Sequence, residues 1–146
     1  MADYEIFELG QVVLQCGLTL PQAKLAYKTY GELNAMRDNV IVMPTFYGAQ
    51  HAENETMMAA WRTLDPKKYF IIAPNMFGNG LSSSPSNTPP PFDRGVFPNI
   101  AVYDNVACQH RLVTEHLGVK QVRLVVGFSM GAQQAFQWGA LYPDLV

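Results

Sequence analysis

The chain has 146 residues, of which 49% are hydrophobic and 15% are charged, a composition typical of one globular domain or part of one and not of a disordered chain. Ten basic and twelve acidic residues give a net charge of −2. Both signs are spread along the chain, which argues against nucleic acid or an anionic membrane as a partner. The composition therefore favours a small-molecule substrate.

The N-terminus has no basic segment followed by an apolar core, so it does not resemble a secretory signal, and no apolar run is long enough to span a bilayer. The two cysteines, Cys16 and Cys108, are too few for a disulfide framework, and we expect both to be buried thiols. The sequence thus favours a cytoplasmic protein with no membrane partner. No metal site and no resident cofactor are predicted.

The first thirty residues contain candidate strands at 4–9, 11–15 and 23–31, where apolar and polar side chains alternate. This pattern is typical of the antiparallel start of a sheet. The next run, 39–44, is apolar on both faces, as expected for a central parallel strand that is covered by helices.

A first helix is predicted after that strand, because apolar side chains recur at helical spacing. They are Met57, Ala60, Trp61 and Leu64, and Pro66 is expected to end the helix.

Two further apolar runs, 69–74 and 122–127, flank a second helix, for which Gly118 is the expected C-terminal stop. The apolar stripe of that helix consists of Val102, Val106, Val113 and Leu117. A third helix follows, with one face formed by Ala132, Ala135, Phe136, Gly139 and Ala140. Buried strands that alternate with amphipathic helices predict a doubly wound α/β sheet.

Residues 75–99 show no periodicity and are rich in Pro, Ser and Gly. A loop of roughly twenty-five residues is long for a compact domain, where such loops are usually functional or disordered. The sequence leaves two interpretations open, an ordered loop near a functional site or a plain surface excursion.

The stretch 127–131, Gly-Phe-Ser-Met-Gly, fits the pattern Gly-x-Ser-x-Gly, which roughly one chain in twenty of this length contains by chance. Its context is more specific, because it joins an apolar strand directly to a helix, as a nucleophile elbow does. The turn of such an elbow leaves no room for side chains at Gly127 and Gly131. Ser129 is therefore the predicted nucleophile. The alternative is an ordinary tight turn in which Ser129 only caps the last helix.

Unpaired N–H groups at a helix N-terminus stabilise the oxyanion that develops on an attacked carbonyl. The N–H of Met130 is one expected donor. The second should come from the loop at 44–48, and Phe46 is the expected residue.

With these residues in place, the sequence resembles an α/β-hydrolase-fold enzyme and, within that fold, the homoserine O-acetyltransferase family. The similarity extends over four blocks, and the segment 78–82 also resembles the fold's Gly-x-Gly-x-Ser turn. The blocks read "LPQAKLAYKTYGELN", "TLDPKKYFIIAPNMFGNGLSSSPSN", "FPNIAVYDNVACQHRLVTEHLGV" and "GFSMGAQQAFQWGALYPDLV".

The resemblance implies acetyl transfer through an acyl-enzyme on Ser129, with Met130 and Phe46 as oxyanion donors. Acetyl-CoA or another acyl-CoA would be the co-substrate and a hydroxyl group the acceptor. Pro44 and Phe128 stand where the family commonly has His and Gly, so the acceptor stays open.

A serine nucleophile needs a base, normally a histidine oriented by a carboxylate, and in this fold both follow the serine in the chain. After Ser129 the sequence has no histidine, and its one acid, Asp144, is expected to be a turn residue. Upstream, His51 is expected to be a loop or wall residue. His110 and His116 should lie on different faces of the second helix, with His116 a favourable partner of the helix dipole.

We therefore expect residues 1–146 to be the N-terminal part of a single longer α/β-hydrolase domain, inactive on its own, with a homodimer as one option for the complete protein. Without further strands, Leu124 and its neighbours Val122, Val125 and Val126 should lie at an open sheet edge. A serine hydrolase or esterase on the same scaffold and a non-catalytic truncated remnant remain as alternatives.

Overall fold

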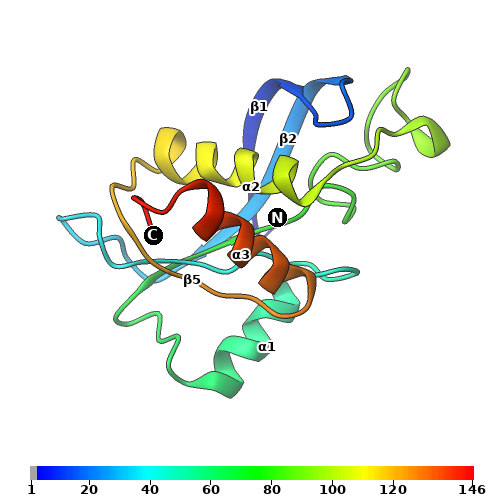
Figure 1. Ribbon diagram of the computed structural model, residues 1–146. Helices are drawn as coiled ribbons and strands as arrows, with labels where there is room; N and C mark the ends of the chain where they lie inside the picture. The colour runs from blue at the N-terminus through cyan, green and yellow to red at the C-terminus, as the bar shows by residue number, and fades with distance from the viewer. Residues whose placement is uncertain (1–2) are drawn as a thin grey trace.

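The computed structural model describes residues 3–146, apart from the side chains of Ala60 and Trp61. One mixed sheet of five strands is flanked by helices on both faces (Figure 1). The strands are β1 (Glu5–Val13), β2 (Thr19–Tyr30), β3 (Val40–Val42), β4 (Phe70–Pro74) and β5 (Val122–Val125). The helices are α1 (His51–Trp61), the 3-10 turn η1 (Arg94–Val96), α2 (Val102–Arg111), its π-helical continuation η2 (Leu112–His116) and α3 (Met130–Leu141).

The strand order in the sheet is β1-β2-β4-β3-β5. β1 pairs antiparallel with β2, and β2 pairs antiparallel with β4, whereas β3 runs parallel to both β4 and β5. This confirms the predicted antiparallel start followed by parallel βαβ units. The first two candidate strands are, however, one strand, whose register against β2 shifts on either side of Gly10.

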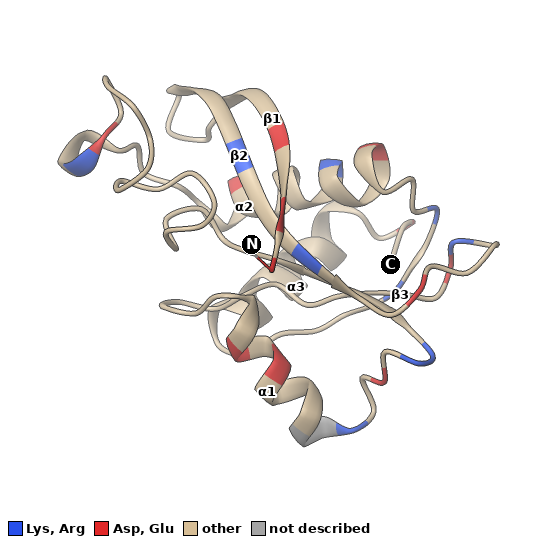
Figure 2. Cartoon of the chain, turned by 180° about the vertical axis from the view of Figure 1, so that it is seen from behind, with Lys and Arg blue, Asp and Glu red and all other residues tan. Residues whose placement is uncertain are grey.

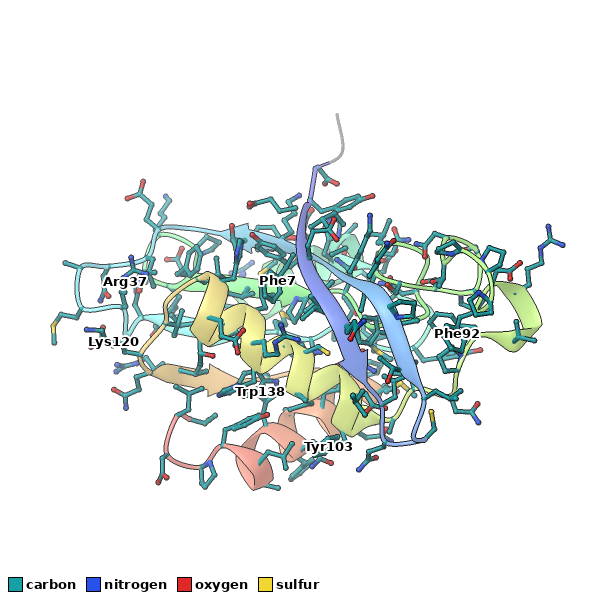
Figure 3. All side chains as sticks on the ribbon, turned by 90° about the horizontal axis from the view of Figure 1, so that it is seen from above. Phe7, Arg37, Phe92, Tyr103, Lys120 and Trp138 are labelled. Atoms are coloured by element: carbon teal, nitrogen blue, oxygen red, sulfur yellow. The ribbon has the colours of Figure 1, made fainter. Side chains whose placement is uncertain are left out.

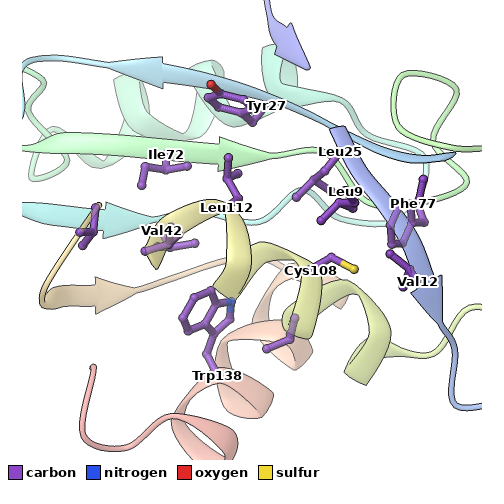
Figure 4. Close-up of a cluster of buried hydrophobic side chains, with 14 of the residues drawn as sticks. Leu9, Val12, Leu25, Tyr27, Val42, Ile72, Phe77, Cys108, Leu112 and Trp138 are labelled. Carbon is purple, nitrogen blue, oxygen red and sulfur yellow. The ribbon is translucent and has the colours of Figure 1, made fainter. Parts of the chain in front are cut away.

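Two apolar clusters lie on opposite faces of the sheet. Val42 and Ile72 belong to the cluster that packs against α2 and α3, together with Leu112 and Trp138 (Figure 4). The alternate residues, such as Ile41, face α1 on the other side. Strands β3 and β4 are therefore buried on both faces, as their continuous apolar sequences predicted.

Helix α1 ends at Trp61, before the predicted end at Pro66. Arg62 adopts a left-handed conformation with φ of 54°, and its N–H donates to the carbonyl of Met58, which closes the helix. Leu64 is buried but lies beyond the helix, so its placement on the helical face was wrong. The side chains of Ala60 and Trp61, two other members of that face, lie outside the described part of the chain.

The second helix carries its predicted apolar stripe into the core. Val106 and Val113 are buried, and Val102 and Leu117 pack against the same cluster. The expected stop is confirmed, since Gly118 has a φ of 63°.

The third helix turns a different face inward from the one predicted. Its buried residues are Gly131, Gln134 and Trp138, whereas Phe136 is 83% exposed. The predicted apolar face instead borders a groove of about 460 Å³ beside β5. The face toward α2 carries side-chain amides that bond to one another, so burial there does not require an apolar sequence.

β5 pairs with β3 and is the edge strand of the described sheet. Leu124 is 41% exposed, and Val125 and Val126 are half-buried, as expected for an open edge. Val122 departs from that expectation, because it is buried in the cluster under α2.

The two cysteines differ. Cys108 is buried on α2, and burial raises the pKa of its thiol to about 12. Cys16 is exposed in the turn between β1 and β2, where the short connection places no element over it, so its predicted burial was wrong.

Charged residues of both signs are spread over the elements and loops (Figure 2). None of the helices within residues 3–146 combines the length and the apolar character that crossing a bilayer requires.

Candidate active site

Ser129 lies in the short turn between the end of β5 and the start of α3. Its backbone has φ of 49° and ψ of −120°, a conformation that residues other than glycine rarely adopt and that costs about 1–3 kcal/mol. The side chain is exposed and makes no capping hydrogen bond to α3. The alternative of a plain helix cap therefore does not describe this serine.

Close contacts with backbone atoms exclude a side chain at both flanking glycines. A Cβ on Gly127 would lie 2.4 Å from the carbonyl carbon of Gly131, and a Cβ on Gly131 would lie 2.8 Å from the carbonyl oxygen of Pro44. Both distances are shorter than any ordinary van der Waals contact. The elbow is thus packed directly against the loop that follows β3, the segment predicted to supply the second oxyanion donor.

The backbone N–H groups of Met130 and Phe46 have no hydrogen-bond partner among the described residues. Met130 is the first residue of α3, so its N–H also carries the positive end of the helix dipole. Both residues line a cavity of about 520 Å³. The arrangement offers two unpaired donors beside an exposed, strained serine.

A family model described as the alpha/beta hydrolase fold matches residues 38–146. The chain belongs to the α/β-hydrolase-fold family.

Known members of this family resemble the chain closely. It is 43% identical to an ethyl acetate hydrolase of Pseudomonas veronii over 98% of its own length and 41% of that protein. A solved structure of the acetyl esterase MekB superimposes with a TM-score of 0.92 at 41% identity, covering 99% of this chain and 42% of that one. A homoserine O-acetyltransferase of Chlorobium chlorochromatii is 36% identical, over 91% of this chain and 39% of that protein.

The comparisons confirm the α/β-hydrolase fold and the resemblance to homoserine O-acetyltransferases. The ethyl acetate hydrolase and the acetyl esterase structure, at 43% and 41% identity, are more similar to the chain than this transferase is. The chain spans about two fifths of the length of these relatives.

The long loop of this α/β-hydrolase-fold chain is anchored by serine hydroxyls. The Oγ atoms of Ser82 and Ser83 each accept a hydrogen bond of 2.9 Å from the backbone of β2. The N–H of Phe77 donates to Asn105 on α2 over 2.9 Å. Residues 76–79 consequently line the same cavity as Phe46 and Met130, which favours the interpretation of an ordered loop near the candidate site.

Phe128, the bulky residue before the serine, packs edge-on against Phe46 with 5.6 Å between ring centroids. It is 55% exposed, so it forms a wall beside the nucleophile without filling the core. A fold member with glycine at this position would lack that wall.

His51 is held by its neighbours and is not available as a base. Asn75 accepts at Oδ1 from the N–H of His51 and from Asn79, so its Nδ2 is the atom that donates to His51 Nδ1, over 3.3 Å. Nδ1 is therefore unprotonated, and Nε2 carries the proton that is donated to Asp3 over 3.2 Å. His51 is the first residue of α1 and is buried, so it is a packed helix residue and not the loop residue that was one of the two expectations.

The other two histidines contact tyrosine side chains away from the elbow. His110 stacks on Tyr142 with 3.8 Å between ring centroids, and burial lowers its pKa. The Nε2 of His116 lies 3.0 Å from the hydroxyl of Tyr27. Asp144 is exposed in the turn after α3, as predicted. Within the described residues, the Ser129 hydroxyl has no hydrogen-bond partner.

Sequence reasoning missed a chain of buried amide groups between α2, α3 and the loop after β3. Trp138 Nε1 donates to Gln109 Oε1 over 2.9 Å, and Gln109 Nε2 donates to Gln134 Oε1 over 2.6 Å. Gln134 Nε2 donates to the carbonyl oxygen of Thr45 over 2.9 Å. Trp138 lies between the two helices (Figure 3). The sequence signal was the placement of Gln134 four residues before Trp138, on one helical face.

Proposed function

We propose that the protein containing this chain is a serine esterase that hydrolyses short acyl esters, such as acetyl esters, through an acyl-enzyme on Ser129. The observation that carries the proposal is the elbow itself, which presents a strained and exposed serine beside the unpaired N–H groups of Met130 and Phe46. The names of the ethyl acetate hydrolase and the acetyl esterase support the choice of substrate class.

In the proposed reaction, Ser129 Oγ attacks the ester carbonyl carbon and gives up its proton to a base. The negative charge that develops on the carbonyl oxygen is stabilised by the two N–H groups. The C–O bond to the alcohol then breaks, and the alcohol leaves with a proton. Water attacks the acetyl-serine in the same way and releases acetate. The base is not assigned to any of the three histidines described above.

A second candidate function is acetyl transfer from acetyl-CoA to a hydroxyl acceptor such as homoserine. The 36% identity to a homoserine O-acetyltransferase favours it. Both reactions pass through the same acyl-enzyme and differ in whether water or a second substrate attacks it. The elbow and its two donors serve either reaction, so these residues do not discriminate between them.

The test uses the complete protein and a fluorophosphonate probe, which bonds covalently to activated serines. We expect the probe to label Ser129 in the wild-type protein. Ser129→Ala should lose this labelling and should hydrolyse p-nitrophenyl acetate roughly 10³-fold or more slowly than wild type. Ser86→Ala, an exposed serine in the long loop, is the matched control and should behave as wild type.

Acetyl-CoA separates the candidates. Acetate release from simple esters, without transfer to homoserine, supports the esterase. Acetyl-CoA-dependent formation of O-acetylhomoserine, with slow hydrolysis, would instead favour the transferase. Absence of labelling at Ser129 would reject both and leave a non-catalytic protein.

A further inference from the structure

The buried amide chain has only one consistent set of donors and acceptors. An indole N–H can only donate, so Gln109 must present its oxygen to Trp138 and its nitrogen to Gln134. Gln134 must then present its oxygen to Gln109, which leaves its nitrogen for the carbonyl of Thr45. Trp138, which reaches from α3 toward α2 (Figure 4), thereby sets the orientation of Gln109.

The acceptor at the end of this chain shares a peptide unit with a candidate oxyanion donor. The carbonyl of Thr45 and the N–H of Phe46 belong to one trans peptide, in which the two groups point in opposite directions. A hydrogen bond that fixes the carbonyl therefore fixes the plane and direction of the Phe46 N–H. That N–H has no partner of its own among the described residues.

The same nitrogen of Gln134 also lies 3.2 Å from the carbonyl oxygen of Met130, in the first turn of α3. One fully buried NH₂ group thus joins the two segments that carry the candidate donors, the loop after β3 and the elbow helix. A buried amide with every partner satisfied holds its neighbours in a single arrangement.

We propose that Gln134 is a positioning residue that fixes the Phe46 N–H relative to the Met130 N–H in the oxyanion site, and this inference rests on the esterase function proposed above. Its hydrogen bond to the Thr45 carbonyl also polarises that peptide, which makes the Phe46 N–H a stronger donor. Donors of this kind lower the barrier only when they are held in place before the charge develops.

Gln134→Met tests the proposal, because methionine has a similar length and no N–H donor. Since losing one oxyanion donor costs about 10²–10³-fold in kcat, misplacing it should slow acylation by p-nitrophenyl acetate by about 10–100-fold. KM should change by less than about threefold, because the donor acts on the transition state. A trifluoromethyl ketone, which forms an oxyanion adduct, should lose affinity in parallel with the rate.

Trp138→Phe is the matched control. It removes a buried hydrogen bond at the far end of the same chain and should destabilise the fold by a similar amount. Because Gln134 Nε2 keeps its two carbonyl acceptors, on Thr45 and Met130, in this variant, acylation should stay within about threefold of wild type. Equal rate losses in the two variants, or a wild-type rate in Gln134→Met, would overturn the proposal.

Gln134→Glu provides a rescue with a distinctive pH dependence. A neutral carboxyl group has one O–H that can replace the lost donor, whereas a carboxylate has none. Acylation relative to wild type should therefore be highest at low pH and fall as the introduced carboxyl ionises. If Gln134 only stabilised the fold, the acylation rate of Gln134→Glu would not recover at low pH under conditions where its unfolding free energy is unchanged.

A readout without catalysis separates this proposal from the proposed function. With ¹⁵N-labelled phenylalanine, the Phe46 amide resonance should shift and exchange faster with solvent in Gln134→Met, and should stay near its wild-type position in Trp138→Phe. An unchanged Phe46 amide in Gln134→Met would reject the positioning role even in an active esterase. A wild-type protein without esterase activity would reject the function, while the amide signal would still decide the position of Phe46.

Discussion

Gly127→Ala directly tests the close packing of the elbow. An added Cβ would lie 2.4 Å from the carbonyl carbon of Gly131 and 2.6 Å from its carbonyl oxygen. Carbon atoms in ordinary contact are about 3.5–4.0 Å apart, so β5 and the first turn of α3 would have to separate by about 1 Å. The opposing atoms are backbone, so no side-chain rotation can relieve the clash.

Overpacking of this kind costs about 1–3 kcal/mol, and we expect the upper part of that range for Gly127→Ala. The shift also moves Ser129 and Met130 relative to Phe46. A displacement of about 1 Å at reacting groups can cost about 10²-fold in rate. Labelling of Ser129 by the fluorophosphonate probe should therefore slow by about that factor.

The assay compares urea unfolding and labelling rate in the complete protein, with Gly95→Ala as control. Gly95 lies in the exposed 3-10 turn η1, and an added Cβ there meets no atom within 4 Å. Its unfolding free energy should change by less than about 0.5 kcal/mol, with labelling unaffected. If Gly127→Ala matched this control in both measurements, the elbow could not be as tightly packed as described.

Two further outcomes follow from the described environment of single residues. A thiol reagent applied to the native protein should modify exposed Cys16, whereas buried Cys108, with a pKa of about 12, should react only after unfolding; equal rates by mass spectrometry would contradict this. Lys28 contacts Asp3 and Glu55 at 2.8 Å, and its hydrogen bond lowers the pKa of Glu55. The Lys28–Glu55 pair stabilises the fold at a pH above the ordinary glutamate pKa, and this stabilisation is lost as the pH falls through the lowered pKa of Glu55. Lys28→Met should therefore reduce the unfolding free energy more at pH 7 than in acid. A difference in urea melts that does not depend on pH would count against the pair.

The parts of the fold that sequence predicted correctly are those that local pattern determines. β3 and β4 are apolar at every position, so their burial on both faces can be predicted without knowing which elements cover them. Gly127 and Gly131 flank Ser129 because the turn geometry itself excludes side chains, and the five-residue sequence 127–131 is enough to predict that requirement. The stop at Gly118 is likewise a property of one residue in a left-handed conformation.

The parts that were predicted wrongly depend on partners far away in the chain. The inward face of α3 is set by Gln134, whose partners lie 25 residues away on α2 and 89 residues away in the loop after β3. No local period indicates that an amide will be buried when the group that satisfies it comes from another element. Similarly, α1 ends at Trp61 because Arg62 adopts a left-handed conformation, and arginine carries no stop signal of its own.

The reaction proposed for Ser129 has two separable parts, stabilisation of the oxyanion and activation of the hydroxyl. In the proposed reaction, oxyanion stabilisation depends on Met130, Phe46 and the packing of the elbow, which are held by contacts among the loop after β3, α2 and α3. Activation of the hydroxyl depends on a base, and His51 does not fit that role because it is buried and its unprotonated Nδ1 already accepts a hydrogen bond from Asn75. In serine enzymes, oxyanion stabilisation and binding alone retain about 10³–10⁴-fold catalysis over water when the triad is broken. A variant such as Gln134→Met should therefore reduce this residual rate as strongly as it reduces the full rate, because it acts on the part of the site that works without the base.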